Sequence, residues 1–145
     1  MGNINAWRNT LPNHIIIAPS GYERSWNIAD ENSDAPDVEM IGDLVDLLQT
    51  YSNINPNKIR ILGTSNGAGL ANRVFIENKD TGLDIVCALV SHLTTANYHN
   101  NGFYFPSGET GDNGTGMPPF EGYDTPTTPI TGRRYLGISL SLIHI

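Results

Sequence analysis

Short apolar runs in this chain alternate with segments in which apolar residues recur every three or four positions. The run at residues 14–19 is apolar on both faces, as a buried parallel strand is, and the runs at residues 59–63 and 85–91 are predicted to be parallel strands as well. The periodic segments, residues 36–51 and 67–78, lie between these runs and have the spacing of amphipathic helices. Another strand begins at Arg134. This alternation predicts an α/β fold in which crossover helices connect the strands of a parallel sheet.

The first predicted helix carries start and stop signals. Asp34 stands at the expected N-cap, Pro36 falls in the first turn, and Asp37 adds an acidic residue to the N-terminus. The turn residues Asn55, Pro56 and Asn57 end this region and lead into the second strand. An apolar stripe along the helix is expected to pack on the sheet: Val38, Ile41, Leu44, Val45 and Leu48.

Residues 94–131 differ from the rest, because they are rich in Gly, Pro, Thr and Asn and show no sustained periodicity. Aromatic residues are interleaved among them: Tyr98, Phe103, Tyr104, Phe105, Phe120 and Tyr123. Long irregular segments in a compact domain are commonly functional. We therefore expect an irregular loop on the substrate side of the strand ends. The alternative is a poorly packed surface loop.

Composition and net charge limit the classes of protein to which this chain can belong. A chain of 145 residues with 39% hydrophobic and 16% charged residues is expected to form one globular domain. The net charge of −7 argues against nucleic acid and anionic membrane surfaces as partners. No apolar stretch has the length of a membrane span, and residues 1–5 show no targeting signal. Cys87 is the single cysteine, and its apolar neighbours predict a buried packing residue.

The segment between the second strand and the second helix carries the most specific motif. Residues 63–67 read Gly-Thr-Ser-Asn-Gly, which is the G-x-S-x-G pattern of a nucleophile elbow. The turn is sharp, so Gly63 and Gly67 are expected to leave the room that a Cβ would fill. Ser65 should then have a positive φ and an exposed hydroxyl. The following helix directs its N-terminal N–H groups to the point where an oxyanion would form.

Other interpretations of these glycines are weaker. In a chain with 15 glycines the bare pattern has low specificity, and the strand before it and the helix after it make it stronger. A phosphate-binding P-loop needs a lysine that does not follow here. A dinucleotide fingerprint needs a third glycine where Asn72 stands. The motif therefore favours a serine nucleophile over nucleotide binding.

Four segments together resemble the polyhydroxybutyrate depolymerase and feruloyl esterase group of α/β-hydrolases. They are Trp26-Asn27, residues 37–41, residues 55–59 and residues 63–69, and the similarity covers roughly residues 11–139. The resemblance implies an extracellular serine esterase that acts on polyesters or on aromatic and acetyl esters of plant polysaccharides, without a metal or an organic cofactor.

Within this resemblance, Ser65 is the implied nucleophile, and the main-chain amide of Asn66 is one implied oxyanion donor. Tyr22 and Trp26 lie in the polar loop after the first predicted strand and are candidates for contact with the substrate. The alternative function is a non-catalytic remnant that binds carbohydrate or polyester on Trp26 and the aromatic segment.

The acid and the histidine that would activate Ser65 have no assigned place in the sequence. In the chain order of this family both follow the strand that begins at Arg134, so we expect them beyond the last residue printed here. His92 follows the third predicted strand and could approach the serine, but it would break that order.

We interpret residues 1–139 as a partial α/β-hydrolase domain that is truncated at both ends. Residues 140–145 resemble the translated transposase adapter of sequencing libraries and are interpreted as a non-native tail. A serine that lacks its base and acid keeps only the catalysis that binding and oxyanion donors give. The isolated chain is therefore expected to hydrolyse esters barely above background.

Overall fold

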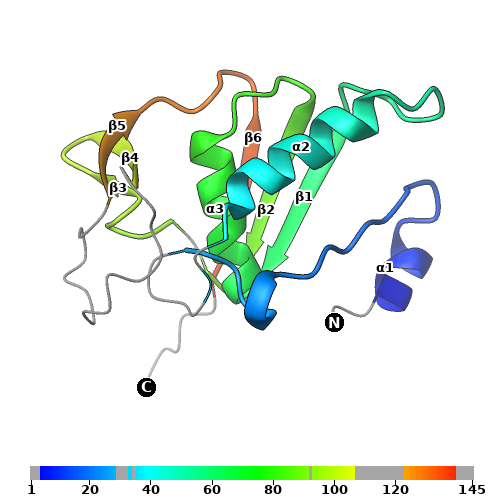
Figure 1. The fold of residues 1–145 in the computed structure, drawn as a ribbon, viewed down its shortest axis with the longest axis horizontal. Helices are drawn as coiled ribbons and strands as arrows, with labels where there is room; N and C mark the ends of the chain where they lie inside the picture. The colour runs from blue at the N-terminus through cyan, green and yellow to red at the C-terminus, as the bar shows by residue number, and fades with distance from the viewer. Residues whose placement is uncertain (1–3, 29–32, 34, 92, 107–122, 140–145) are drawn as a thin grey trace.

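The computed structural model describes residues 4–28, 33, 35–91, 93–106 and 123–139. Helices and strands follow one another along this part of the chain, as Figure 1 shows. The elements are α1 (Ile4–Thr10), the 3-10 helix η1 (Tyr22–Arg24), α2 (Asp37–Gln49), β1 (Ile59–Thr64), α3 (Asn66–Glu77), β2 (Leu83–Leu89), β3 (Tyr98–His99), β4 (Gly102–Pro106), β5 (Tyr123–Thr127) and β6 (Arg134–Ile138).

A parallel sheet with the strand order β1-β2-β6 carries the helices. β2 pairs in parallel with both neighbours, so Ile61, Val86 and Tyr135 lie in one row across the sheet. The predicted strands at residues 59–63 and 85–91 are confirmed as β1 and β2, with ends shifted by at most two residues. The last predicted strand is present as β6. The mixed α/β class and the parallel sheet are therefore confirmed.

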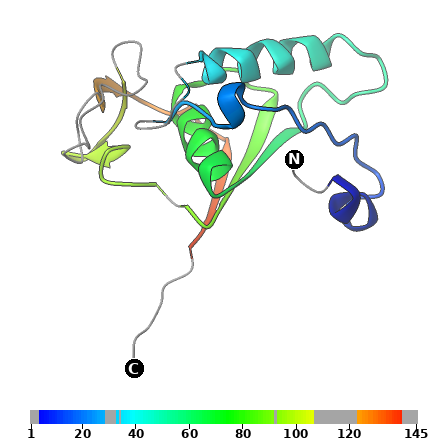
Figure 2. The same ribbon diagram turned by 60° about the horizontal axis from the view of Figure 1, so that its bottom comes forward.

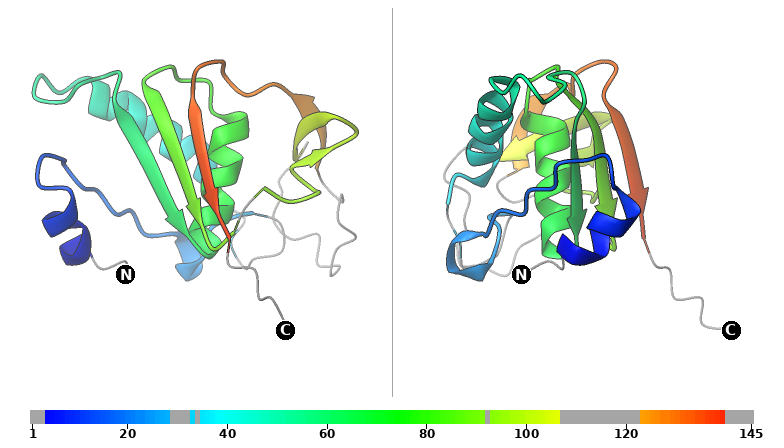
Figure 3. Two further views of the ribbon diagram at one scale, coloured as in Figure 1. Left: turned by 180° about the vertical axis from the view of Figure 1, so that it is seen from behind. Right: turned by 90° about the vertical axis from the view of Figure 1, so that its right-hand side faces the viewer.

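Helices α2 and α3 lie on the same face of this sheet, as the side view in Figure 3 shows. α3 packs against β1 and β2, and α2 packs against α3. Both helices were predicted within three residues of their ends. Burying a large aliphatic side chain contributes roughly 1.5–3 kcal/mol, so this layer supplies much of the stability. The buried core consists of Val38, Ile41, Val45, Leu70, Ala71, Val74, Leu83 and Val86.

The strand predicted at residues 14–19 is wrong. These residues form no strand, and Ile15 and Ile17 are 61% and 45% exposed. A strand requires a neighbour to complete its hydrogen bonds, and in the described part of the chain β1 pairs with β2 alone. A polar contact joins this segment to β1, with His14 Nε2 and Arg60 Nη1 3.1 Å apart. The apolar residues of this segment have no neighbouring strand to pair with in the described part of the chain.

The start of α2 also differs from the prediction. Pro36 stands at the N-cap position with φ −76° and ψ 64°, just before the helix and not in its first turn. The proposed cap Asp34 lies outside the described residues. Asp37 opens the helix, and its carboxylate accepts a hydrogen bond from the Asn27 main-chain N–H at 2.7 Å. The Asp37 carboxylate therefore fixes the loop that contains Asn27, 10 residues earlier in the chain.

Cys87 is half-buried, so the prediction of a buried packing residue is wrong. Along β2 the residues Val86 and Ala88 are fully buried, and Cys87 lies between them on the opposite face of the strand. The residues paired with Cys87 on the neighbouring strands are Leu62 of β1 and Leu136 of β6, which are 43% and 51% exposed. The helices α2 and α3 cover the other face of the sheet.

The segment predicted to be irregular contains three short strands. β3, β4 and β5 form a second, antiparallel sheet in the order β3-β4-β5. This sheet and α1 lie at opposite ends of the molecule in Figures 1 and 2. Its aromatic residues order it against the main fold, since the rings of Phe75 and Phe103 pack edge to face with centroids 6.2 Å apart. Residues 107–122 of the segment lie outside the described residues.

Arg133 connects the end of α3 to the parallel sheet. It is 9% exposed and donates hydrogen bonds to main-chain carbonyls near the end of the helix and the start of β2. The accepting carbonyls are those of Val74, Phe75, Asn78, Asp80 and Leu83. Burial lowers the pKa of Arg133, with the charge of Asp80 acting in the opposite direction. Carbonyls near the C-terminus of α3 are in this way satisfied largely by Arg133, while Lys79 Nζ donates to the Ile76 carbonyl at 3.2 Å.

Candidate functional site

Ser65 lies on the single-residue turn between β1 and α3. Its backbone has φ 55° and ψ −122°, and the residue is exposed. The Ser65 N–H donates to the Leu89 carbonyl at 3.0 Å, while its own carbonyl accepts from Ala68 N–H at 2.9 Å. The predicted positive φ and exposure are confirmed. Bonds to β2 and to α3 hold this strained turn in one conformation.

A second strained residue stands beside the first. Val90 directly follows β2 and has φ 72°, which is a rare conformation for a β-branched residue. Its N–H donates to the Ile138 carbonyl at 2.7 Å, so the strain is fixed by pairing with β6. The carboxyl ends of two adjacent strands therefore carry residues with unusual backbone geometry. Such strain is concentrated at functional sites in many proteins.

The two glycines that flank the serine have different roles. A Cβ at Gly63 would overlap the Gly67 carbonyl and lie 2.8 Å from Ala68 Cα, so only glycine fits. A Cβ at Gly67 would lie 3.6 Å from Trp26 Nε1, which is an ordinary van der Waals contact. The prediction that both positions exclude a side chain holds for Gly63 and is wrong for Gly67.

We expect Gly63→Ala to lower the free energy of unfolding by about 3 kcal/mol or more, because the new methyl group meets main chain that has no room to move. Gly67→Ala is the matched control. It should leave stability unchanged or raise it by up to about 1 kcal/mol, since alanine favours the helix. Urea unfolding followed by circular dichroism measures both, and equal losses in the two variants would contradict this account.

Asn66 contributes its main chain and its side chain to different parts of the site. Its main-chain amide lies at the start of α3, beside Ser65, where the helix dipole favours negative charge. Its side chain is bound to the main chain of Trp26, accepting from the N–H at 2.9 Å and donating to the carbonyl at 3.4 Å. The side chain therefore fixes a loop, and the predicted role of the amide as an oxyanion donor remains a prediction.

An open cleft of about 450 Å³ has Ser65 in its wall. Apolar and polar groups alternate in the lining, which suits a ligand that has both an alkyl part and hydrogen-bonding atoms. The lining residues come from the loop before α2, from the β1–α3 turn and α3, from the segment between β2 and β3, and from β5: Ile28, Ser65, Asn66, Gly69, Asn72, Val90, Ser91, Thr94, Ala96, Asn97 and Tyr123.

The two predicted substrate-side residues are absent from this lining. Tyr22 is 60% exposed in η1, and Trp26 is half-buried and packs against the core. The Asn66 side chain accepts a hydrogen bond from the Trp26 main-chain N–H, which holds Trp26 next to the β1–α3 turn. The indole ring therefore lies beside Gly67. Tyr123, which the sequence only assigned to the aromatic segment, is the aromatic residue of the cleft.

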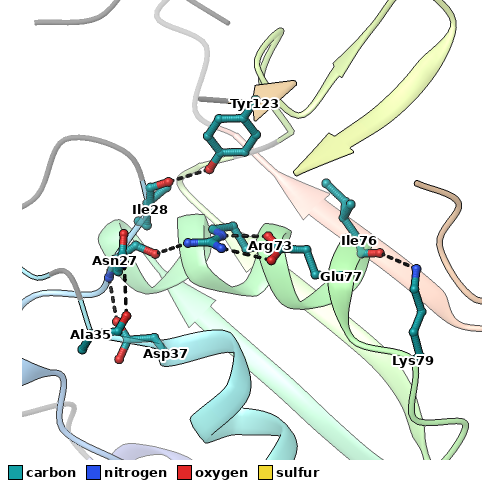
Figure 4. A network of polar contacts seen from close by, with 9 residues as sticks. All are labelled: Asn27, Ile28, Ala35, Asp37, Arg73, Ile76, Glu77, Lys79 and Tyr123. Carbon is teal, nitrogen blue, oxygen red and sulfur yellow. Dashed lines mark hydrogen bonds and ion pairs between the residues drawn. The ribbon is translucent and has the colours of Figure 1, made fainter. Parts of the chain in front are cut away.

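A network of polar contacts fixes the loop that forms one wall of the cleft (Figure 4). Arg73 Nη1 donates to the Asn27 carbonyl at 3.0 Å, and the Tyr123 hydroxyl donates to the Ile28 carbonyl at 2.6 Å. Arg73 also forms an ion pair with Glu77, with Nε and Oε1 2.7 Å apart. Sequence reasoning missed this network. The signal that points to it is an Arg-Glu pair four residues apart on an otherwise apolar helix.

The network changes the proton affinity of its buried members. Burial raises the pKa of Asp37, with the hydrogen bond from Asn27 and the charge of Arg73 opposing the change. Burial lowers the pKa of Arg73, but the hydrogen bond and charge of Glu77 outweigh it, and the pKa lies above its ordinary value. Arg73 therefore remains a cation, which suits its contact with a main-chain carbonyl.

The two described histidines lie away from the cleft lining. His14 contacts Arg60, and His99 stacks on Tyr104 with ring centroids 3.9 Å apart. His92 and His144 lie outside the described residues. The cleft as described thus holds Ser65 and the start of α3, and the histidine that would activate the serine is unassigned.

Comparison with protein-family models, with curated proteins and with solved structures found no match. The hydrolase resemblance therefore rests on the sequence segments that carry it and on the elbow geometry.

Within the described residues, no group of three or more His, Cys, Asp or Glu side chains is arranged to hold a metal ion. None of the described helices combines the length and the apolar character that a membrane span requires.

Proposed function

We propose that this chain belongs to an α/β-hydrolase that cleaves carboxylic esters with Ser65 as its nucleophile. The observation that carries the proposal is the backbone of Ser65, with φ 55°, at a strand-to-helix turn whose first glycine excludes a Cβ. The strained turn presents the hydroxyl at the cleft, and the start of α3 lies beside it. A structural serine would gain nothing from this conformation.

In the proposed reaction, the Ser65 oxygen attacks the ester carbonyl and passes its proton to a histidine. The carbonyl oxygen becomes an oxyanion, and the Asn66 main-chain N–H stabilises it together with the N-terminus of α3. The tetrahedral intermediate collapses, the alcohol leaves with the proton from the histidine, and water then releases the acid from the acyl-enzyme. The histidine and its acid partner lie outside the described residues in this proposal.

The proposed substrates are esters of short hydroxy acids in polyesters, or aromatic and acetyl esters of plant polysaccharides. The family resemblance supports these classes, and the mixed polar and apolar lining of the cleft is compatible with each. The same resemblance supports an extracellular enzyme. The binding-remnant alternative loses support because Trp26, its main stacking residue, packs against the core.

A fluorophosphonate probe tests the proposal directly. The serine oxygen forms a bond to phosphorus, the P–F bond breaks, fluoride leaves, and the hydroxyl proton passes to base or solvent. We expect covalent labelling of the folded full-length natural protein, with the adduct at Ser65 in a peptide map by mass spectrometry. Labelling of other residues only, or none in folded protein, would contradict a serine hydrolase.

A further inference from the structure

Ile28 lies one helical turn from the proposed nucleophile. A Cβ at Gly69 would overlap Ile28 Cδ1 and would lie 3.1 Å and 3.2 Å from its Cγ1 and Cγ2. The Gly69 N–H donates to the Ser65 carbonyl at 3.3 Å, so Gly69 stands one helical turn after Ser65, which precedes α3. The Ile28 side chain therefore covers the first turn of α3, and both Ile28 and Gly69 line the cleft.

The main chain of Ile28 is unusually well fixed for a loop. The carbonyls of three successive residues, Trp26, Asn27 and Ile28, accept hydrogen bonds from the side chains of Asn66, Arg73 and Tyr123. Two of these donors stand on α3, and the third comes from β5, 95 residues along the chain from Ile28. The Ile28 backbone therefore keeps its position when a ligand enters, because moving it would break one buried and two partly buried hydrogen bonds.

We propose that Ile28 limits the length of the acyl chain that the cleft accepts, an inference that rests on the proposed function of Ser65. An acyl chain whose carbonyl carbon is held at Ser65 and which runs along α3 meets the Ile28 side chain within about one helical turn, roughly 5.4 Å. Short acyl groups fit this space. Longer chains require Ile28 to move, so removing its outer carbons should extend the pocket.

Binding of unreactive ester analogues tests the inference without requiring catalysis. In Ser65→Ala protein, methyl ethyl ketone and methyl heptyl ketone are titrated while the Gly69 amide signal is followed by NMR. Ile28→Ala should increase the affinity for the long ketone relative to the short one by about tenfold or more, because each methylene in an apolar pocket contributes a large factor. Ile28→Val, which disturbs packing less, should give a smaller change in the same direction.

Ile15→Ala is the matched control, because Ile15 is 61% exposed and lies away from the cleft lining. It should leave the preference between the two ketones unchanged. An unchanged preference in both Ile28 variants, or an equal change in Ile15→Ala, overturns the inference. If the Ile28 variants change the ketone preference but the protein with Ser65 intact is not labelled by the fluorophosphonate, only the esterase function is refuted. If Ser65 is labelled but the ketone preference does not change, only the role of Ile28 is refuted.

Discussion

Ser65→Ala is expected to lower the rate of fluorophosphonate labelling and of p-nitrophenyl butyrate hydrolysis by a factor on the order of a thousand or more. The reason is that the substitution removes the only atom that forms the covalent bond, while the strained turn and the start of α3 remain. Labelling is measured by mass spectrometry over time, and hydrolysis by release of p-nitrophenol. Both assays use the full-length natural protein.

Ser91→Ala is the matched control for this substitution. Ser91 lines the same cleft and undergoes the same chemical change, but it stands after β2 and not on the elbow. Its removal should leave both rates within a few-fold of the original protein. If Ser65→Ala keeps the original rates, or if Ser91→Ala loses them to the same extent, the assignment of Ser65 as nucleophile is wrong.

Arg133→Met is expected to lower the free energy of unfolding by about 3–5 kcal/mol. The guanidinium donates to main-chain carbonyls at the end of α3 and the start of β2, and methionine offers none of these hydrogen bonds. Each buried carbonyl left without a donor costs about 1–3 kcal/mol, partly offset where water enters. Urea unfolding followed by circular dichroism measures the loss.

Arg134→Met serves as the comparison. Its side chain is 70% exposed and contacts Asp84 at the surface, where an ion pair contributes only about 0–1 kcal/mol. A similar loss of stability in both variants would show that charge, and not the hydrogen bonds of the α3 terminus, makes Arg133 important. A loss under about 1 kcal/mol for Arg133→Met would contradict its proposed structural role.

Much of the fold could be predicted because its signals are local. The β1-α3-β2 unit follows from an apolar run, a glycine-flanked turn and a segment with helical periodicity, all contiguous in the sequence. The positive φ of Ser65 could be predicted for the same reason, since Gly63 and the following helix define the turn within a few residues.

The errors came from features that depend on distant parts of the chain. Residues 14–19 have the composition of a buried strand, but pairing depends on a neighbour that no local pattern specifies. The strands within residues 94–131 were missed because they are short and rich in turn residues, and they are held by packing such as that of Phe103 on Phe75. Gly67 was expected to be sterically required, and only the position of the Trp26 ring shows that a methyl group fits.

The sequence by itself determined the elbow: a strand, a glycine that excludes a Cβ, a serine with positive φ and a helix that begins directly after it. These features depend on sterics and hydrogen bonds between residues a few positions apart. Only the tertiary structure decided what surrounds the serine. Ile28 and Tyr123 meet beside it because a hydroxyl and a carbonyl 95 residues apart form a hydrogen bond, and such contacts depend on how the whole chain packs.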